Sequence, residues 1–168
     1  MKVGASVCAS SGFNALKFLD LARLEKITWY SGVPTMHQAI LLRANKNKEA
    51  AKNLNLRLIR SSSASLPPAV FKDLNEAFNC PVIEAYGMTE ATHQMTSNPL
   101  PPKQQKAGFV GLPAGPEVCI MSENGDMMKQ GEEGEVCIKG ENVTLGYENN
   151  EEANKTCLLY TSPSPRDA

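Results

Sequence analysis

Short apolar runs that suit buried strands alternate with stretches of helical spacing over the first half of the chain. The strand-like runs are 27–30, 56–60 and 81–85, and helical stretches at 34–44 and 67–78 lie between them. A strand that returns to its sheet through a helix runs parallel to the strand before it. The order therefore predicts an α/β fold, in which helices pack on a parallel sheet.

Further elements are predicted on both sides of this alternation. Small and β-branched residues over 3–9 predict a buried strand, and apolar spacing over 13–26 predicts a helix. The polar stretch 45–55 is expected to be the frayed end of the preceding helix followed by a solvated loop. Short strands dominate 108–146, and Asn124-Gly125 between two of them indicates a hairpin. We therefore predict a small antiparallel β unit after the parallel sheet.

The predicted domain organisation has three parts. An α/β subdomain covers 1–107 and carries the candidate site, and the antiparallel β unit covers 108–156. The segment 157–168, CLLYTSPSPRDA, breaks with the preceding pattern and resembles a translated sequencing adapter. We expect this tail to be disordered and outside the fold; a genuine Ser/Pro-rich terminus is the alternative. Met1 is predicted to be an internal methionine of a longer protein.

Composition argues against several classes of protein. A net charge of −1 gives no electrostatic attraction to nucleic acid or to an anionic membrane. No apolar run approaches the roughly eighteen residues of a membrane span, and no secretory signal opens the chain. The five cysteines form no C-x-x-C pair, so neither a zinc site nor a disulfide framework is predicted. A small-molecule partner in the cytosol or an organelle matrix is expected.

Polar groups gather just after the predicted strand that precedes Tyr86. Within the stretch EAYGMTEATHQM, Tyr86-Gly87 is followed by a hydroxyl at Thr89, a carboxylate at Glu90 and an imidazole at His93. An open α/β sheet binds its ligand at the carboxyl ends of its strands. A phenol ring stacks on a base, a hydroxyl donates to a phosphate, and a carboxylate binds Mg²⁺. The stretch therefore predicts a nucleotide and metal site.

A second polar loop follows the preceding strand of the predicted sheet. The run 56–60 leads into the small residues 61–65, SSSAS, so two successive strands deliver polar loops to one edge. Alternatively, these serines only cap the helix that begins near Pro67, and His93 faces solvent. His37 either faces the same pocket or packs against the start of its helix.

The string YGMTE resembles the tyrosine–threonine–glutamate signature of the adenylate-forming enzymes, which include acyl-CoA synthetases, adenylation domains and luciferases. The longer strings EAYGMTEATHQMTSN and GEVCIKGENVTLGYENNEEANKT are similar to the oxalate–CoA ligase group. This resemblance covers roughly 3–156 and implies part of the large N-terminal domain of an AMP-forming acid–CoA ligase. In the implied reaction a carboxylate attacks the α-phosphate of ATP, and the thiol of coenzyme A then displaces AMP.

The resemblance also implies roles for the residues of both loops. Tyr86 would stack on adenine, Thr89 would contact the adenylate phosphate, and Glu90 would bind Mg²⁺, which makes Thr89 and Glu90 the implied catalytic residues. Ser63 and His93 would bind the far carboxylate of oxalate, since a desolvated dicarboxylate needs hydrogen-bond donors. The implied nucleotide-binding set is Ser62, Ser63, Ala64, Glu84, Ala85, Tyr86, Gly87 and Thr89.

Alternatives to an oxalate ligase stay open at this point. They are another acyl-CoA synthetase, such as a 4-coumarate-like or medium-chain ligase, and a non-catalytic nucleotide-binding remnant. The resemblance also implies a phosphate-binding loop and a C-terminal lysine that the 168 residues do not contain. Because charge stabilisation is distributed over such groups, we predict that the chain is inactive alone. The implied locations are the cytosol and the peroxisome.

Overall fold

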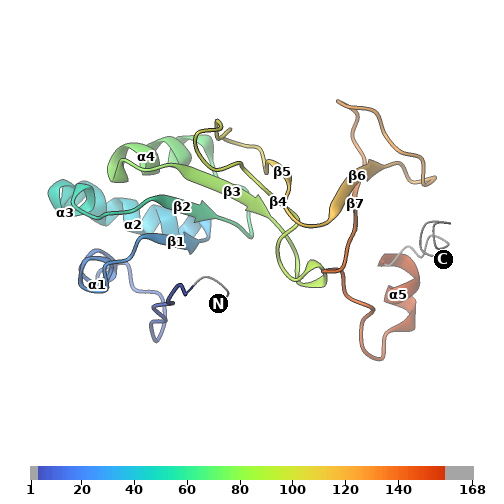
Figure 1. Cartoon of the computed structure of the whole chain (residues 1–168), viewed down its shortest axis with the longest axis horizontal. Helices are drawn as coiled ribbons and strands as arrows, with labels where there is room; N and C mark the ends of the chain where they lie inside the picture. Colours follow the sequence, from blue (N-terminus) through green and yellow to red (C-terminus); the bar gives the residue numbers. More distant parts are fainter. Residues whose placement is uncertain (1–3, 158–168) are drawn as a thin grey trace.

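A computed structural model of the chain describes residues 4–157 (Figure 1). The predicted tail lies outside the described residues from residue 158 on. Two sheets are present: a five-stranded sheet of order β1-β2-β3-β4-β5, and a two-stranded sheet of β6 and β7. The predicted fold class is thereby confirmed, with a parallel sheet, flanking helices and a small antiparallel β unit after them.

The first three strands of the larger sheet are parallel. Their register places Gly32 beside Ser61 and Ser61 beside Glu84, so their carboxyl ends meet at one edge. The loops that follow β2 and β3 therefore leave the sheet side by side. The three strands are β1 (Trp29–Gly32), β2 (Leu58–Ser61) and β3 (Val82–Tyr86).

Helices α2 (Pro34–Lys46) and α4 (Pro68–Phe78) connect these parallel strands and lie behind them in Figure 1. Each begins with a proline, whose missing N–H is no loss in the first turn of a helix. Asn79 ends α4 in the left-handed conformation, with φ of 50°. The core between the helices and the strands holds fully buried side chains: Ile40, Ile59, Leu66, Leu74, Phe78 and Val82.

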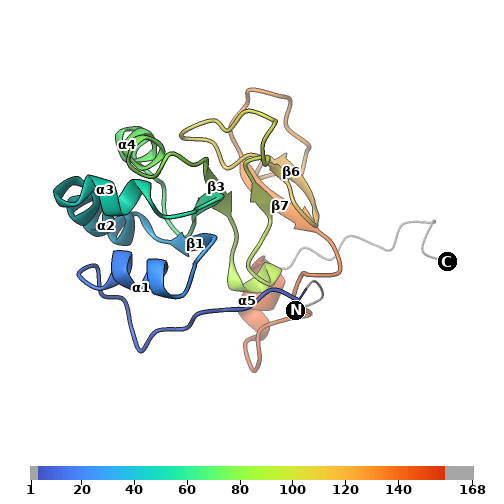
Figure 2. The same cartoon turned by 60° about the vertical axis from the view of Figure 1, so that its left-hand side comes forward.

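The remaining strands are antiparallel. β4 (Thr96–Ser97) pairs with β3, and β5 (Leu112–Pro113) pairs with β4, so both extend the larger sheet. β6 (Glu117–Met121) and β7 (Glu135–Lys139) form the separate ribbon of Figure 2. The division between residues 107 and 108 stays a prediction.

Two predicted elements near the start of the chain differ from the structure. Residues 4–10 are exposed and irregular rather than a buried strand. Within the described residues β1 pairs only with β2, and no ladder joins residues 4–10 to its free edge. The predicted helix 13–26 is reduced to α1 (Phe18–Leu24), because the Asn14 side chain accepts from the amides of Leu16 and Lys17 and forms a turn instead.

A later prediction also needs correction. The stretch 45–55 is not only loop, since it contains the short helix α3 (Lys48–Lys52), and the Asn47 side chain caps this helix by accepting from the Ala50 amide. The first strand within the stretch 108–146 is β5, which pairs with β4 in the larger sheet. A last helix, α5 (Glu151–Cys157), follows the ribbon. None of the helices in the described part of the chain is long and apolar enough to cross a membrane.

His37 packs inside the α2–β1 contact. Its side chain is 0% exposed, and Nδ1 lies 3.2 Å from the Tyr30 hydroxyl. Gly32 leaves room for the ring, since a Cβ at that position would lie 3.1 Å from Cε1. Burial lowers the pKa of His37 to about 4, against a weaker opposing hydrogen bond with the Gly32 backbone. The imidazole is therefore neutral at pH 7, and it supports the fold.

The buried imidazole makes stability depend on pH. In the unfolded chain the histidine has a pKa of about 6.5, whereas in the folded chain His37 has a pKa of about 4. Between these two pH values the unfolded state therefore binds one more proton than the folded state. The free energy of unfolding should therefore fall as pH falls from 6.5 towards 4. Urea unfolding of the chain between pH 7 and pH 5 measures this fall.

The chain offers a matched control because it has two histidines, and the second, His93, is exposed. His37→Phe should lose part of the pH dependence, whereas His93→Gln, which keeps the buried imidazole, should retain the part that His37 contributes. An equally steep fall in His37→Phe would show that His37 does not titrate in this range.

Candidate functional site

The loop after β2 turns from buried to exposed within four residues. The Ser62 amide donates to the Gly32 carbonyl at 3.2 Å, which continues the pairing of the parallel strands. Ser61 and Ser62 are 1% and 4% exposed, and neither hydroxyl has a hydrogen-bond partner in the described protein. Ser63 and Ala64 are exposed, and Ser63 has φ of 74°. The second half of this loop is thus presented to solvent at the sheet edge.

Strand β3 changes character in the same way at Tyr86. Glu84 and Ala85 are each 5% exposed, and Glu84 Oε1 accepts from the Gly108 amide at 2.8 Å. The Glu84 carboxylate therefore makes a hydrogen bond within the protein. Its assignment to nucleotide binding stays a prediction. The Tyr86 ring at the end of the strand is 37% exposed, so an aromatic face is available at the edge.

A closed turn follows Tyr86. The His93 amide donates to the Met88 carbonyl at 2.9 Å, and the Met95 amide donates to the Tyr86 carbonyl at 2.9 Å. A Cβ on Gly87 would lie 1.3 Å from the His93 carbonyl oxygen, so only glycine fits. The turn brings Tyr86 and His93 to the two ends of one compact loop, hereafter the β3–β4 loop (87–95).

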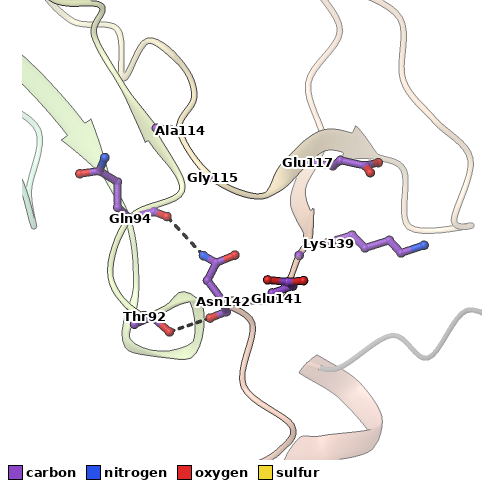
Figure 3. A pocket seen from close by; sticks show the side chains of 9 residues that line it. Thr92, Gln94, Ala114, Gly115, Glu117, Lys139, Glu141 and Asn142 are labelled. Carbon is purple, nitrogen blue, oxygen red and sulfur yellow. Dashed lines mark hydrogen bonds between the residues drawn. The ribbon is translucent and has the colours of Figure 1, made fainter. Parts of the chain in front are cut away.

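Two consecutive residues of this loop have left-handed backbone. Thr92 has φ of 51° and His93 has φ of 77°, a conformation that costs a non-glycine residue about 1–2 kcal/mol. Contacts from a distant segment hold it in place. Thr92 Oγ1 donates to the Asn142 carbonyl at 2.8 Å (Figure 3), and Asn142 Nδ2 donates to the Ala91 carbonyl at 2.7 Å. The segment after β7 therefore holds the β3–β4 loop in this conformation through hydrogen bonds.

Glu90 is held by the same later part of the chain. The Tyr147 hydroxyl donates to Glu90 Oε1 at 2.6 Å, and the Thr144 amide donates to the Glu90 carbonyl at 2.7 Å. The hydrogen bond from Tyr147 is the main cause that lowers the pKa of Glu90. The carboxylate is therefore ionised at neutral pH and fixed in orientation. Thr89, its neighbour, is exposed at the start of the 3₁₀ turn Thr89–Ala91.

Sequence reasoning missed Tyr147 and Asn142. They lie 57 and 51 residues from their partners in the β3–β4 loop, beyond any local spacing rule. Both residues lie in GEVCIKGENVTLGYENNEEANKT, which resembles the oxalate–CoA ligase group, and that resemblance was the available signal.

An open cavity of about 530 Å³ lies between the β3–β4 loop and the β6–β7 ribbon (Figure 3). Its wall on the loop side includes Thr92 and Gln94, and its ribbon side carries Lys139 and Glu141. The predicted residues Ser63, Tyr86 and Glu90 are not part of its lining. Residues 4–157 contain no group of three or more His, Cys, Asp or Glu placed to hold a metal ion. A metal at Glu90 would need further ligands from a bound molecule.

The family model described as AMP-binding enzyme matches residues 1–148. The chain belongs to the AMP-binding enzyme family. Among curated proteins this AMP-binding chain is 50% identical to an oxalate–CoA ligase of Arabidopsis thaliana over 155 residues, which is 90% of the chain and 30% of that ligase. It is 47% identical to the oxalate–CoA ligase of Saccharomyces cerevisiae, over 89% of the chain and 27% of that protein.

Solved structures of the AMP-binding family share the fold. An anthranilate–CoA ligase in complex with anthranoyl-AMP matches with a TM-score of 0.81 and 31% identity, over 92% of this chain and 30% of that one. O-succinylbenzoate–CoA synthetase of Bacillus subtilis, in complex with ATP and magnesium, matches with a TM-score of 0.73 and 28% identity, over 88% and 30%. The chain thus spans about 30% of the length of these relatives.

The close contact at Gly87 predicts a large effect of one added methyl group. Gly87→Ala should destabilise the chain by roughly 3 kcal/mol or more, because the His93 peptide cannot stay in place beside a Cβ. Gly125→Ala is the control: it has φ of 84° but nothing within 4 Å, and should cost only about 1 kcal/mol. Urea unfolding compares the two, and equal losses would contradict the packing argument.

The hydrogen bond to Glu90 predicts a change of its pKa. Tyr147→Phe removes the donor that favours the ionised form, so the pKa of Glu90 should rise towards its ordinary value. NMR titration of the Glu90 side-chain carbon measures it. Tyr86→Phe, which removes a hydroxyl from the same site without touching this bond, should leave the pKa of Glu90 where it is.

Proposed function

We propose that this chain is the adenylate-binding part of an AMP-forming acid–CoA ligase, and that the acid is oxalate. The observation that carries the proposal is the ionised, hydrogen-bonded Glu90 in the loop that follows the exposed Tyr86 at the carboxyl edge of the sheet. This is where an open α/β sheet receives its ligand. The match to the AMP-binding family supports the nucleotide, and the two oxalate–CoA ligases among the relatives support the acid.

Adenine would lie between the two loops that leave β2 and β3. The register that pairs Ser61 with Glu84 brings Ser62, Ser63 and Ala64 next to the start of the β3–β4 loop. Tyr86 offers a half-exposed ring for stacking, and a small side chain at Ala64 leaves space for a flat base beside it. Gly87 and Thr89 complete the nucleotide side of the proposed site.

The donor set at Glu90 fits Mg²⁺. One fixed carboxylate is a hard oxygen ligand, and Mg²⁺ in nucleotide sites commonly takes one or two carboxylates, water and substrate phosphates. Tyr147 occupies Oε1 as a hydrogen-bond donor, and Oε2 would bind the ion. Bound there, the ion would stabilise negative charge on the phosphate oxygens as the acyl-adenylate forms. Thr89 would donate its hydroxyl to the same phosphate.

Ser63 and His93 suit a small dicarboxylate. Both are exposed, each follows one of the two paired strands, and both hold a left-handed backbone with φ of 74° and 77°. Non-glycine residues in that conformation concentrate at binding sites, where the surrounding structure holds them. A serine hydroxyl and an imidazole are donors that a second carboxylate requires once it is desolvated.

Substrate discrimination tests the proposal on the full-length ligase that would contain this segment. We expect ATP–pyrophosphate exchange with oxalate, and at least tenfold lower kcat/KM with acetate or a cinnamate, which lack the second carboxylate. Ser63→Ala and His93→Ala should each lower kcat/KM for oxalate roughly tenfold or more by removing a donor to a charged group. Ser65→Ala, in the same exposed loop, is the matched control and should behave as wild type.

Three outcomes distinguish an oxalate ligase from a ligase of another acid and from a non-catalytic nucleotide-binding protein. Equal turnover of oxalate and a monocarboxylate would refute the assignment to oxalate but keep the ligase. No exchange with any acid would favour a non-catalytic nucleotide-binding protein. The isolated chain should give no exchange signal, and a signal from it would contradict the prediction of inactivity. Coenzyme A as the acyl acceptor, and a cytosolic or peroxisomal location, remain predictions.

A further inference from the structure

Arg60 lies on the face of the sheet that α2 and α4 leave open. Along β2 the side chains alternate: Ile59 and Ser61 are buried at 0% and 1% exposed, whereas Leu58 and Arg60 are half-buried. In the register with β1, Arg60 stands beside Ser31. A cation at this place is unusual for a strand of a parallel sheet, whose residues are mostly apolar.

The guanidinium of Arg60 joins three segments of the chain. Nη1 donates to Ser31 Oγ at 3.0 Å, and Nη2 donates to Gln94 Oε1 at 3.3 Å. β1, β2 and the β3–β4 loop are thereby linked through one side chain. Figure 3 shows that the Gln94 side chain points away from the cavity, while its backbone carbonyl faces Asn142. The side chain of Gln94 and its backbone carbonyl are thus each held by a hydrogen bond.

The charge of Arg60 has no counter-charge in the described part of the protein. No carboxylate of residues 4–157 lies within 4.0 Å of it; the ion pair that does occur there joins Lys72 and Glu76 on α4. Burial lowers the pKa of Arg60, which indicates that its surroundings do not compensate the positive charge. Both hydrogen-bond partners are neutral, so the positive potential is not cancelled locally.

Gln94 directly follows His93, which gives the Arg60 contact a consequence for the site. His93 holds φ of 77°, and its carbonyl is packed against Gly87 with no space to spare. A shift of the Gln94 backbone would therefore turn the His93 peptide and its imidazole together. The Asn142 bond to the Gln94 carbonyl is 3.4 Å and the Arg60 bond to the Gln94 side chain is 3.3 Å, so Arg60 supplies one of two comparable contacts at this residue.

We propose that Arg60 is a positioning residue that fixes Gln94, and through it His93, for the second carboxylate of the substrate. This inference rests on the proposed function, because it assigns His93 to that carboxylate. The uncancelled charge adds to the effect, since it favours an anion on this side of the β3–β4 loop. Arg60 itself makes no contact with substrate in this role.

Steady-state kinetics of the full-length ligase test the role. Arg60→Met should raise the KM for oxalate roughly tenfold and leave the KM for ATP within about twofold, the size expected for one charge-assisted hydrogen bond. Gln94→Ala removes the same contact from the other side and should raise the KM for oxalate in the same direction. The double variant should be no worse than the poorer single variant, because both changes break one link.

Two further variants separate positioning from general damage. Arg60→Lys keeps the charge but loses the planar fork, so its KM for oxalate should lie between those of wild type and Arg60→Met. Arg57→Met removes an equal charge from an exposed side chain three residues earlier and should leave the KM for oxalate unchanged. A uniform fall of kcat with both KM values unchanged in Arg60→Met would mark Arg60 as merely structural and overturn the proposal.

Amide hydrogen exchange of the same full-length protein needs no substrate. Arg60→Met and Gln94→Ala should accelerate exchange at His93, whose amide is bonded to the Met88 carbonyl, and Arg57→Met should not. Unchanged exchange at His93 in Arg60→Met would overturn the positioning role whatever the substrate is. If wild type rejects oxalate but His93 exchange responds to Arg60, the proposed acid fails while the positioning role stands.

Discussion

The close approach of the His93 carbonyl to Gly87 is the contact on which the candidate site depends. The His93 peptide occupies the space where any other residue would have its Cβ, so β3 can turn back within a few residues of Tyr86. The hydrogen bonds from His93 to Met88 and from Met95 to Tyr86 then close the loop. A ring, a carboxylate and an imidazole are thereby held around one turn, at the edge where the parallel strands end.

Long-range contacts stabilise this turn where its own backbone is strained. Thr92 and His93 adopt a left-handed conformation, which a short loop of non-glycine residues does not maintain alone. Asn142 and Tyr147 reach it from beyond the β6–β7 ribbon, and Arg60 reaches it from β2. The segment after the ribbon is thus part of the site's support. A change there can alter the β3–β4 loop without touching it in sequence.

The parts of the fold that local rules govern were predictable from the sequence. Pro34 and Pro68 mark helix starts, Asn79 marks a helix end, and the strands between them follow from short apolar runs. The failures have a common cause in long-range pairing. Residues 4–10 have strand-like composition but no neighbour in the described sheet, and composition cannot supply a partner.

The candidate site shows the same division between local and distant information. The motif around Tyr86 placed its residues at the end of a strand, because strand, glycine and polar groups follow one another in the chain. Tyr147 was not linked to Glu90, since no periodicity connects residues 57 apart. Arg60 ends a run that predicts a buried strand, and a charge in such a run is the signal that marks it.

Unsatisfied polar atoms give a further reason to place the function at this edge. Buried side-chain atoms without a hydrogen-bond partner in the described protein include the hydroxyls of Ser61, Ser62 and Thr96. Ser61 ends β2 and Ser62 follows it, and Thr96 pairs with Tyr86 across β3 and β4. Each such hydroxyl costs roughly 1–3 kcal/mol, and a sequence shaped by stability alone would replace it with alanine or valine. Ser61 pairs with Glu84 and Thr96 pairs with Tyr86, so these hydroxyls lie on the strands that lead into the edge where we propose that the nucleotide binds.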